Sequence, residues 1–170
     1  MTTTANLPKG LPSVVIHRSN YLAAAPKVVQ ALLQVSATAT GIEKPLQELV
    51  KIRASQINGC AYCLCMHTRD ARAMGESDER MHLLATWREA KSFFTPREQA
   101  ALTWTECLTL LAEKGAPDDV YEALAAEFSE QEQAELTLLV CLINTWNRFN
   151  VGFHAEPQAE ADVAKGAVAA

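Results

Sequence analysis

The chain has 170 residues, of which 49% are apolar, so it can bury one sizeable core and needs no second domain. Its formal net charge is −5, and its fifteen lysines and arginines are scattered along the chain, which argues against nucleic acid as a partner. The first ten residues lack the basic start and apolar core of a signal peptide, and no apolar run reaches the length of a membrane span. We therefore expect a soluble, cytoplasmic protein with no membrane partner.

The N-terminal segment, residues 1–20, contains two Pro-containing steps and little periodicity. It is expected to form an extended arm with one short apolar segment, Val14 to Ile16. Apolar residues then recur at helical spacing from Ala25, with Pro26 in the first turn and Gly41 as the stop. This pattern predicts the first helix of the domain.

A second helix is predicted from Lys44 to the Asn58-Gly59 pair. Its buried face consists of apolar residues at helical spacing: Leu46, Leu49, Val50 and Ile57. Glu48 lies on the flank of that face, beside Ile52 and Ser55, so periodicity alone predicts that it is partly solvated.

A third helix is predicted to open at Cys60 and to run to about Met74, where Gly75 suits the left-handed end position. Four further helices are expected at 77–87, at 96–114, from 117 and at 129–151. Two of them begin with the residues of a capping box, which are Thr95 with Glu98 and Ser129 with Glu132. The last helix is apolar on all sides between Leu136 and Ile143, and it is predicted to be the central one.

Nowhere do apolar and polar residues alternate over the length of a strand. The chain is therefore predicted to be all-α, with a single-domain bundle of about seven helices at residues 21–155. Residues 156–170 are rich in alanine and have no apolar stripe, so they are predicted to form a disordered tail.

Three of the five cysteines fall within residues 60–65, which disfavours a structural disulfide framework. Cys107 and Cys141 lie in apolar helical patterns and are expected to be buried core residues. The remaining thiols, Cys60, Cys63 and Cys65, are followed closely by the imidazole of His67. This cluster indicates reactive or metal-binding chemistry.

Two thiols separated by two residues at a helix start can form a disulfide with little backbone movement. The positive helix end and a nearby imidazole favour a thiolate at neutral pH. Because His67 lies one turn beyond Cys63, we predict that Cys63 attacks an oxidised substrate. Cys60 is then the resolving thiol, more accessible to an external reductant. Glu48, from the preceding helix, is predicted to hold the imidazole and relay its proton.

The spacing of Glu48, Cys60, Cys63 and His67 resembles the active-site pattern of the AhpD-like alkylhydroperoxidase branch of the carboxymuconolactone decarboxylase family. The segments 53–60, 66–72 and 143–148 are also similar to that family, and the resemblance spans roughly residues 25–153. It implies an AhpD-like helical fold that assembles into homo-oligomers, as dimers, trimers or hexamers. It also implies thiol peroxidase activity, in which these four residues form a proton relay.

The same resemblance implies a hydroperoxide substrate and a dithiol reductant, which is a dihydrolipoyl protein in the characterised relative. Thioredoxin-like donors or small thiols are equally compatible with this sequence, and no cofactor and no metal are expected. The chain departs from the pattern at Tyr62, where the characterised peroxidase has a second histidine, so a relay step is missing or is supplied by the phenol. Cys65 is expected to point about 200° away from Cys63 and to have no direct role. Family members without the cysteine pair are decarboxylases, and the retained pair argues against that activity.

Three alternatives to a peroxidase remain at the level of the sequence, namely a zinc site, inert thiols and a non-enzymatic redox sensor. Cys60 and Cys63 with Cys65 or His67 form a candidate zinc site, although such sites usually need a second ligand pair at a distance. Covalent haem is excluded because Leu64 rather than histidine follows Cys63. The thiols could also be inert, or they could form a switchable disulfide in a non-enzymatic redox-sensing protein.

Overall fold

The computed structural model describes residues 18–38 and 41–157. Within these ranges it contains nine α-helices, two short 3-10 helices and no β-strand, which confirms the predicted all-α fold. The α-helices are α1 (Tyr21–Ala24), α2 (Pro26–Ser36), α3 (Lys44–Asn58), α4 (Ala61–Ala73), α5 (Asp78–Leu83), α6 (Pro96–Thr109), α7 (Leu111–Lys114), α8 (Asp118–Glu127) and α9 (Glu130–Gly152). The 3-10 helices are η1 (Leu84–Thr86) and η2 (Lys91–Phe93). None of the helices described is both long and apolar enough to cross a bilayer.

The predicted arm and tail cannot be compared with the structure. Most of residues 1–20, including the apolar segment 14–16, and most of residues 156–170 lie outside the described ranges. All seven predicted helices are present, as α2 to α6, α8 and α9. The helix α1 is an addition that periodicity did not indicate, since it has only four residues and is capped by the side chain of Asn20.

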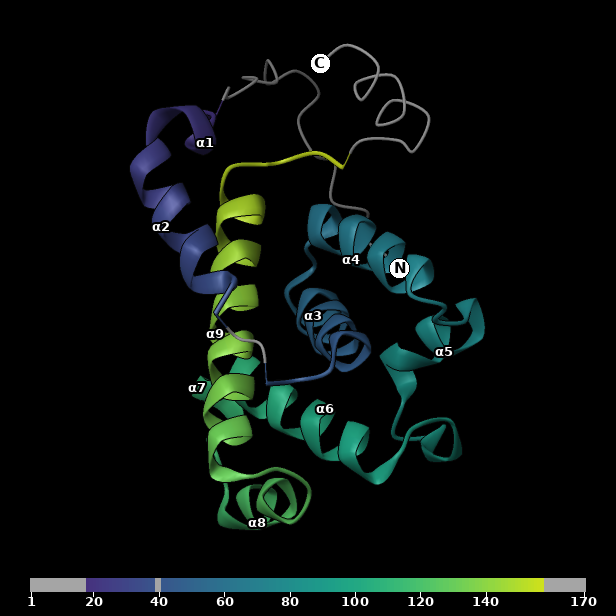
Figure 1. The fold of residues 1–170 in the computed structure, drawn as a ribbon. Helices are drawn as coiled ribbons and strands as arrows, with labels where there is room; N and C mark the ends of the chain where they lie inside the picture. Colours follow the sequence, from purple (N-terminus) through teal and green to yellow (C-terminus); the bar gives the residue numbers. More distant parts are fainter. Residues whose placement is uncertain (1–17, 39–40, 158–170) are drawn as a thin grey trace, which may run out of the picture.

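Helix α3 is the most enclosed element of the fold. It packs against α4, α6 and α9, and Figure 1 shows it between these three helices. No residue from Leu46 to Asn58 is exposed. The prediction that the last helix is central is therefore wrong, because α9 keeps a solvent-facing side that includes Cys141. Both Cys107 and Cys141 were predicted to be core residues. Cys107 is buried as predicted, but Cys141 is exposed.

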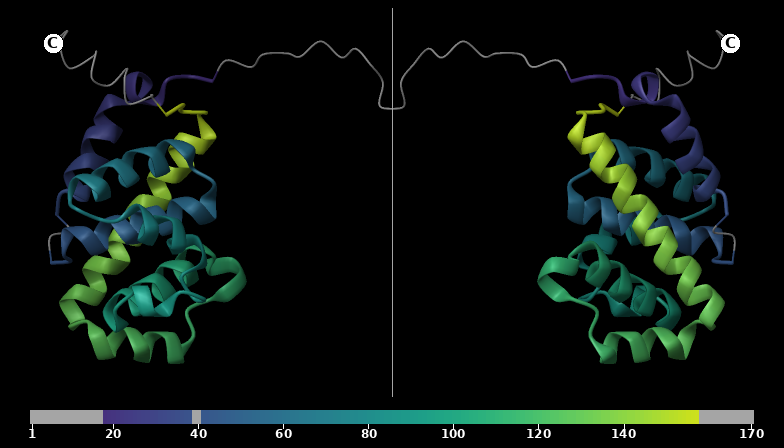
Figure 2. Two further views of the ribbon diagram at one scale, coloured as in Figure 1. Left: turned by 90° about the vertical axis from the view of Figure 1, so that its right-hand side faces the viewer. Right: turned by 90° about the vertical axis from the view of Figure 1, so that its left-hand side faces the viewer.

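Helix α9 runs the length of the molecule, from α8 at one end to α1 and α2 near the other (Figure 1, Figure 2). It packs against α8 at its start and against α2 and α4 farther along, and the side views in Figure 2 show α8 at one end and α1 with α2 near the other. One apolar cluster packs α3, α6, α8 and α9 together, and a second packs α3 against α4, α5, η1 and the middle of α6. Both predicted capping boxes are present, at Thr95 and Ser129. Each such cap contributes about 1 kcal/mol.

Two predicted helices are shorter than expected. The helix predicted at 77–87 tightens into η1 before Trp87, whose indole N–H donates to Glu106 on α6 over 2.9 Å. The helix predicted at 96–114 is interrupted at Leu110, where the backbone leaves the helical region. The break directly follows Thr109, whose hydroxyl accepts a hydrogen bond from Asn144 on α9.

Candidate active site

The predicted thiol segment begins at a sharp turn between α3 and α4. Gly59 ends α3 in the left-handed region, at φ 64°, which glycine adopts without the steric cost of a Cβ. The next residue, Cys60, is the N-cap of α4, so Cys63 is the third residue of that helix. On the other side of the turn, Asn58 donates to the side chains of Asn144 and Asn147 on α9 over 3.0 and 2.9 Å. These bonds hold the end of α3, and with it the turn into α4, against α9.

Both cysteines of the pair are buried free thiols. Cys60 is 1% exposed and Cys63 is 0% exposed, and the amide of Cys63 donates to Cys60 Sγ over 3.4 Å. Cys60 was predicted to be the more accessible thiol, but both cysteines are packed with Ala54 and Ile143 and are almost fully buried. Cys63 lines the pocket described below and Cys60 does not, so access from the pocket favours Cys63.

Glu48 forms the contact with His67 that the sequence predicted. Its Oε2 atom accepts a hydrogen bond of 2.7 Å from His67 Nδ1, and the carboxylate is only 5% exposed. Lys51 Nζ donates to the other oxygen, Oε1, also over 2.7 Å. Because an ionised carboxylate can only accept, Nδ1 carries the hydrogen and His67 Nε2 is left as a proton acceptor.

The partners of Glu48 decide its ionisation. Burial raises the pKa of this carboxyl, but the hydrogen bonds from His67 and Lys51 outweigh that effect and hold the pKa below its ordinary value. Glu48 was expected to be partly solvated, and it is buried because α4 covers the flank of α3 on which it lies. Lys51, its second partner, lies three residues farther along the same helix, a spacing at which opposite charges meet, but the sequence analysis did not consider it.

The ionisation of Cys63 differs from the sequence-based expectation of a thiolate at neutral pH. Burial raises the pKa of this thiol to about 11, and the neighbouring Cys60 adds to the effect. Hydrogen bonds from Asn150 and Asn147 lower the pKa but do not offset the burial. In the resting state Cys63 is therefore a neutral thiol.

Two asparagines of α9 complete the surroundings of the thiols, and the sequence analysis missed both. Asn147 donates to Ser55 on α3 over 3.0 Å, and Asn150 donates to Cys63 Sγ over 3.2 Å. Together with Asn144 they recur every third residue on the otherwise apolar, buried side of α9. That spacing is a signal in the sequence, since buried amides need partners and mark a polar site within a core.

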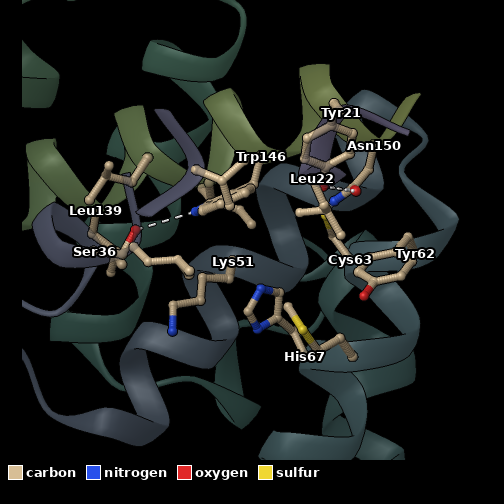
Figure 3. Close-up of a pocket in the computed structure, with 15 residues that line it drawn as sticks. Tyr21, Leu22, Ser36, Lys51, Tyr62, Cys63, His67, Leu139, Trp146 and Asn150 are labelled. Atoms are coloured by element: carbon tan, nitrogen blue, oxygen red, sulfur yellow. Dashed lines mark hydrogen bonds between the residues drawn. The ribbon is translucent and has the colours of Figure 1, made fainter. Parts of the chain in front are cut away.

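A pocket of about 290 Å³ opens in front of Cys63 and His67. Its walls come from α1, α2, α3, α4 and α9, and Figure 3 shows Lys51, Cys63 and His67 together with Trp146 and Tyr21 around it. Most of its surface is apolar, from side chains such as Leu139, Ile143 and Trp146. Trp146 is thus part of the pocket wall, while Trp87 and Trp104 are core residues as expected.

The predicted alternative of a cysteine-based metal site has little geometric support. In the described part of the chain, one group of three possible metal ligands lies within 4.8 Å, and it consists of Glu48, His67 and Asp70 without any thiol. Lys51 already occupies the Glu48 carboxylate, which makes even this group a poor cation site. Cys65 lines a different pocket from Cys63, as its helical position predicted.

Comparisons with known proteins identify the family. Residues 23–106 match the model of the carboxymuconolactone decarboxylase family. The uncharacterized protein YdfG of Bacillus subtilis is 38% identical over 79% of this chain and 92% of its own length. Among solved structures, ATU0492 of Agrobacterium tumefaciens, a protein of unknown function, is 39% identical with a TM-score of 0.82, over 85% of this chain and all of that one.

A more distant structure has the same fold. It is an alkylhydroperoxidase AhpD core, an uncharacterized peroxidase-related protein of Ralstonia eutropha, which is 19% identical with a TM-score of 0.72 over 82% of this chain and 75% of that one. The helical fold with its Cys60 and Cys63 pair, the family model and the relatives at 38% and 39% identity agree. The chain therefore belongs to the AhpD-like carboxymuconolactone decarboxylase family.

Proposed function

We propose that the protein is a thiol-dependent hydroperoxide reductase that uses a Cys60–Cys63 redox disulfide and a Glu48–His67 proton relay. The observation that carries this proposal is the position of Cys63. It lies next to the thiol of Cys60, and it lines the same pocket as His67, whose imidazole is held by Glu48. A role in antioxidant defence, as AhpD, has been proposed for the Agrobacterium relative, and this supports the same activity.

In the first step, Cys63 sulfur attacks the terminal oxygen of a hydroperoxide, ROOH. The O–O bond breaks, the alcohol ROH leaves, and Cys63 becomes a sulfenic acid. Cys60 sulfur then attacks Cys63 sulfur and displaces water, which forms the disulfide. A dithiol donates two electrons and two protons, restores both thiols and is itself oxidised to a disulfide.

His67 and Glu48 supply the proton transfer that this sequence of steps requires. Since Cys63 rests as a neutral thiol, its proton must leave as sulfur attacks, and the alkoxide leaving group must gain one. His67 Nε2 can accept the first proton and return it to the leaving oxygen. Glu48 stabilises the imidazolium formed between these events, as in other carboxylate-imidazole pairs.

The test is steady-state consumption of hydroperoxides by the purified protein with a panel of dithiols, including a dihydrolipoyl protein and a thioredoxin. We expect Cys63→Ser to abolish turnover and Cys60→Ser to accumulate sulfenic acid on Cys63, detected by mass spectrometry. The matched control is Cys141→Ser, because Cys141 is exposed and outside the pocket. Full turnover by Cys63→Ser would refute the assignment.

The other predictions remain to be tested with the same protein. Slow or absent turnover despite a reversible Cys60–Cys63 disulfide would favour the redox-sensing alternative, and bound metal in the purified protein would favour the metal-binding one. A homo-oligomer stays a prediction, supported by the exposed apolar residues Val28, Leu33 and Val35 on α2. The reductant and a cytoplasmic location stay predictions as well.

A further inference from the structure

A chain of hydrogen bonds reaches Cys63 from α9 and α1 without involving His67. Asn150 Nδ2 on α9 donates to Cys63 Sγ over 3.2 Å, and Tyr21 Oη on α1 donates to Asn150 Oδ1 over 2.8 Å. All three side chains are buried, with Asn150 only 4% exposed. Figure 3 shows the bond between Tyr21 and Asn150 at the edge of the pocket, next to Cys63.

The orientation of the Asn150 amide matters because its two ends act oppositely on the sulfur. The amide has one accepting oxygen and one donating nitrogen. While the phenol of Tyr21 bonds Oδ1, the nitrogen faces Cys63, and an N–H donor stabilises a thiolate more than a thiol. A flipped amide would turn its oxygen towards the sulfur and oppose the charge that develops during attack.

Tyr21 is itself held in place by packing that does not need its hydroxyl. Its ring centroid lies 5.0 Å from that of Phe149 and 5.5 Å from that of Phe153. The short helix α1 is capped by Asn20, which accepts hydrogen bonds from the backbone of residues 22 and 23. The aromatic contacts fix where the hydroxyl lies, and the hydroxyl fixes the amide.

We propose that Tyr21 is a positioning residue that sets the nucleophilicity of Cys63 by orienting the Asn150 amide. The inference rests on the proposed function, since it concerns the thiol that attacks the hydroperoxide. The other titratable groups around this thiol are Cys60 and Tyr62 beside it at the start of α4, His67 farther along α4, and Glu48 with Lys51 on α3. Helix α9 presents only uncharged amides to the sulfur, Asn147 and Asn150.

The test is the rate of Cys63 alkylation as a function of pH in the reduced protein, with no peroxide present. Tyr21→Phe keeps the ring and removes the hydroxyl, so we expect alkylation at a fixed pH to slow about three- to tenfold, the effect of one hydrogen bond. The matched control is Tyr121→Phe, because Tyr121 is exposed on α8, where its ring contacts Trp104. It should leave the profile unchanged.

A double-mutant cycle shows whether Tyr21 acts through Asn150. In an Asn150→Ala background, Tyr21→Phe should have no further effect on alkylation. If Asn150→Ala fails to fold by circular dichroism, the cycle is run with Asn150→Leu, which is of similar size but has neither an acceptor for Tyr21 nor a donor for the sulfur. A wild-type profile for Tyr21→Phe, or equal slowing in both backgrounds, would overturn the proposal.

This measurement separates the inference from the proposed function. Alkylation reports on the reduced thiol alone and needs no turnover. If the wild-type protein consumes no hydroperoxide, the proposed function fails while the coupling between Tyr21 and Cys63 can still be measured. If hydroperoxide is consumed but Tyr21→Phe alkylates normally, only the inference fails.

Discussion

The resting state of Cys63 gives a prediction that needs no knowledge of the substrate. With a pKa of about 11, only about one molecule in ten thousand carries a thiolate at Cys63 at neutral pH. A thiol with an ordinary pKa near 8.5 would be ionised in roughly three molecules in a hundred. The two cases differ about 300-fold in thiolate population. Iodoacetamide reacts with the thiolate, so its rate reports this population.

The decisive feature is the slope of the rate with pH rather than its absolute value. Burial of Cys63 lowers the alkylation rate by the same factor at every pH, because it limits access of the reagent. Ionisation, in contrast, changes the alkylation rate tenfold per pH unit below the pKa. We expect the logarithm of the Cys63 alkylation rate to rise with unit slope from about pH 7 to about pH 10 without levelling off. An ordinary thiol levels off near pH 9.

The assay is alkylation of the reduced wild-type protein followed by tryptic digestion and tandem mass spectrometry. Cys63 falls in the peptide 54–69, in which fragmentation separates it from Cys60 and Cys65, and Cys141 falls in a different peptide. The exposed Cys141 serves as an internal control for the reactivity of the reagent in the same sample, and circular dichroism shows whether the protein stays folded at each pH. A plateau for Cys63 at or below about pH 9 would refute the reasoning, because burial would then not dominate its ionisation.

Three substitutions test other parts of the structure. Glu48→Gln removes the carboxylate that fixes His67, and we expect kcat/KM for hydroperoxide to fall at least about tenfold with an unchanged circular dichroism spectrum. Glu106→Gln should lower the free energy of unfolding in urea by roughly 3 kcal/mol at neutral pH, since burial raises the pKa of Glu106 but Trp87, Arg88 and Arg53 lower it to about 2. A lowered pKa stabilises the fold above about pH 4.5, so the difference should vanish as the pH falls towards 2. Gly59→Ala should cost about 1–2 kcal/mol in the same assay through backbone strain alone, because a Cβ there meets no atom within 4 Å.

Features that depend on neighbouring residues in the sequence were predicted correctly. The capping boxes at Thr95 and Ser129, the end of α3 at the Asn58-Gly59 pair and the left-handed Gly75 each involve residues within one turn of each other. The i to i+4 spacing of Cys63 and His67 likewise brings both residues to one pocket. Such short-range geometry is fixed by the helix itself, whatever surrounds it.

Features that depend on the number of neighbouring helices were not predictable from periodicity. Glu48 was predicted to be partly solvated and is buried, whereas Cys141 was predicted to be buried and is exposed. Periodicity describes one face of a helix, whereas α3 is covered on several sides and α9 keeps one side open. The Tyr21 to Asn150 bond spans 129 positions in the chain, and no local pattern could pair these residues.

The raised pKa of Cys63 and the proposed relay together constrain what the pocket can reduce. A buried, largely apolar site disfavours any step that leaves an uncompensated charge. Attack on a hydroperoxide avoids this, because the proton that leaves Cys63 can pass through His67 to the departing alkoxide, and the pocket gains no net charge. Alkylation has no such acceptor, so its proton must reach solvent. Hydroperoxide reduction should therefore depend less steeply on pH than alkylation of the same sulfur, and two profiles of equal slope would mean that His67 does not carry the proton.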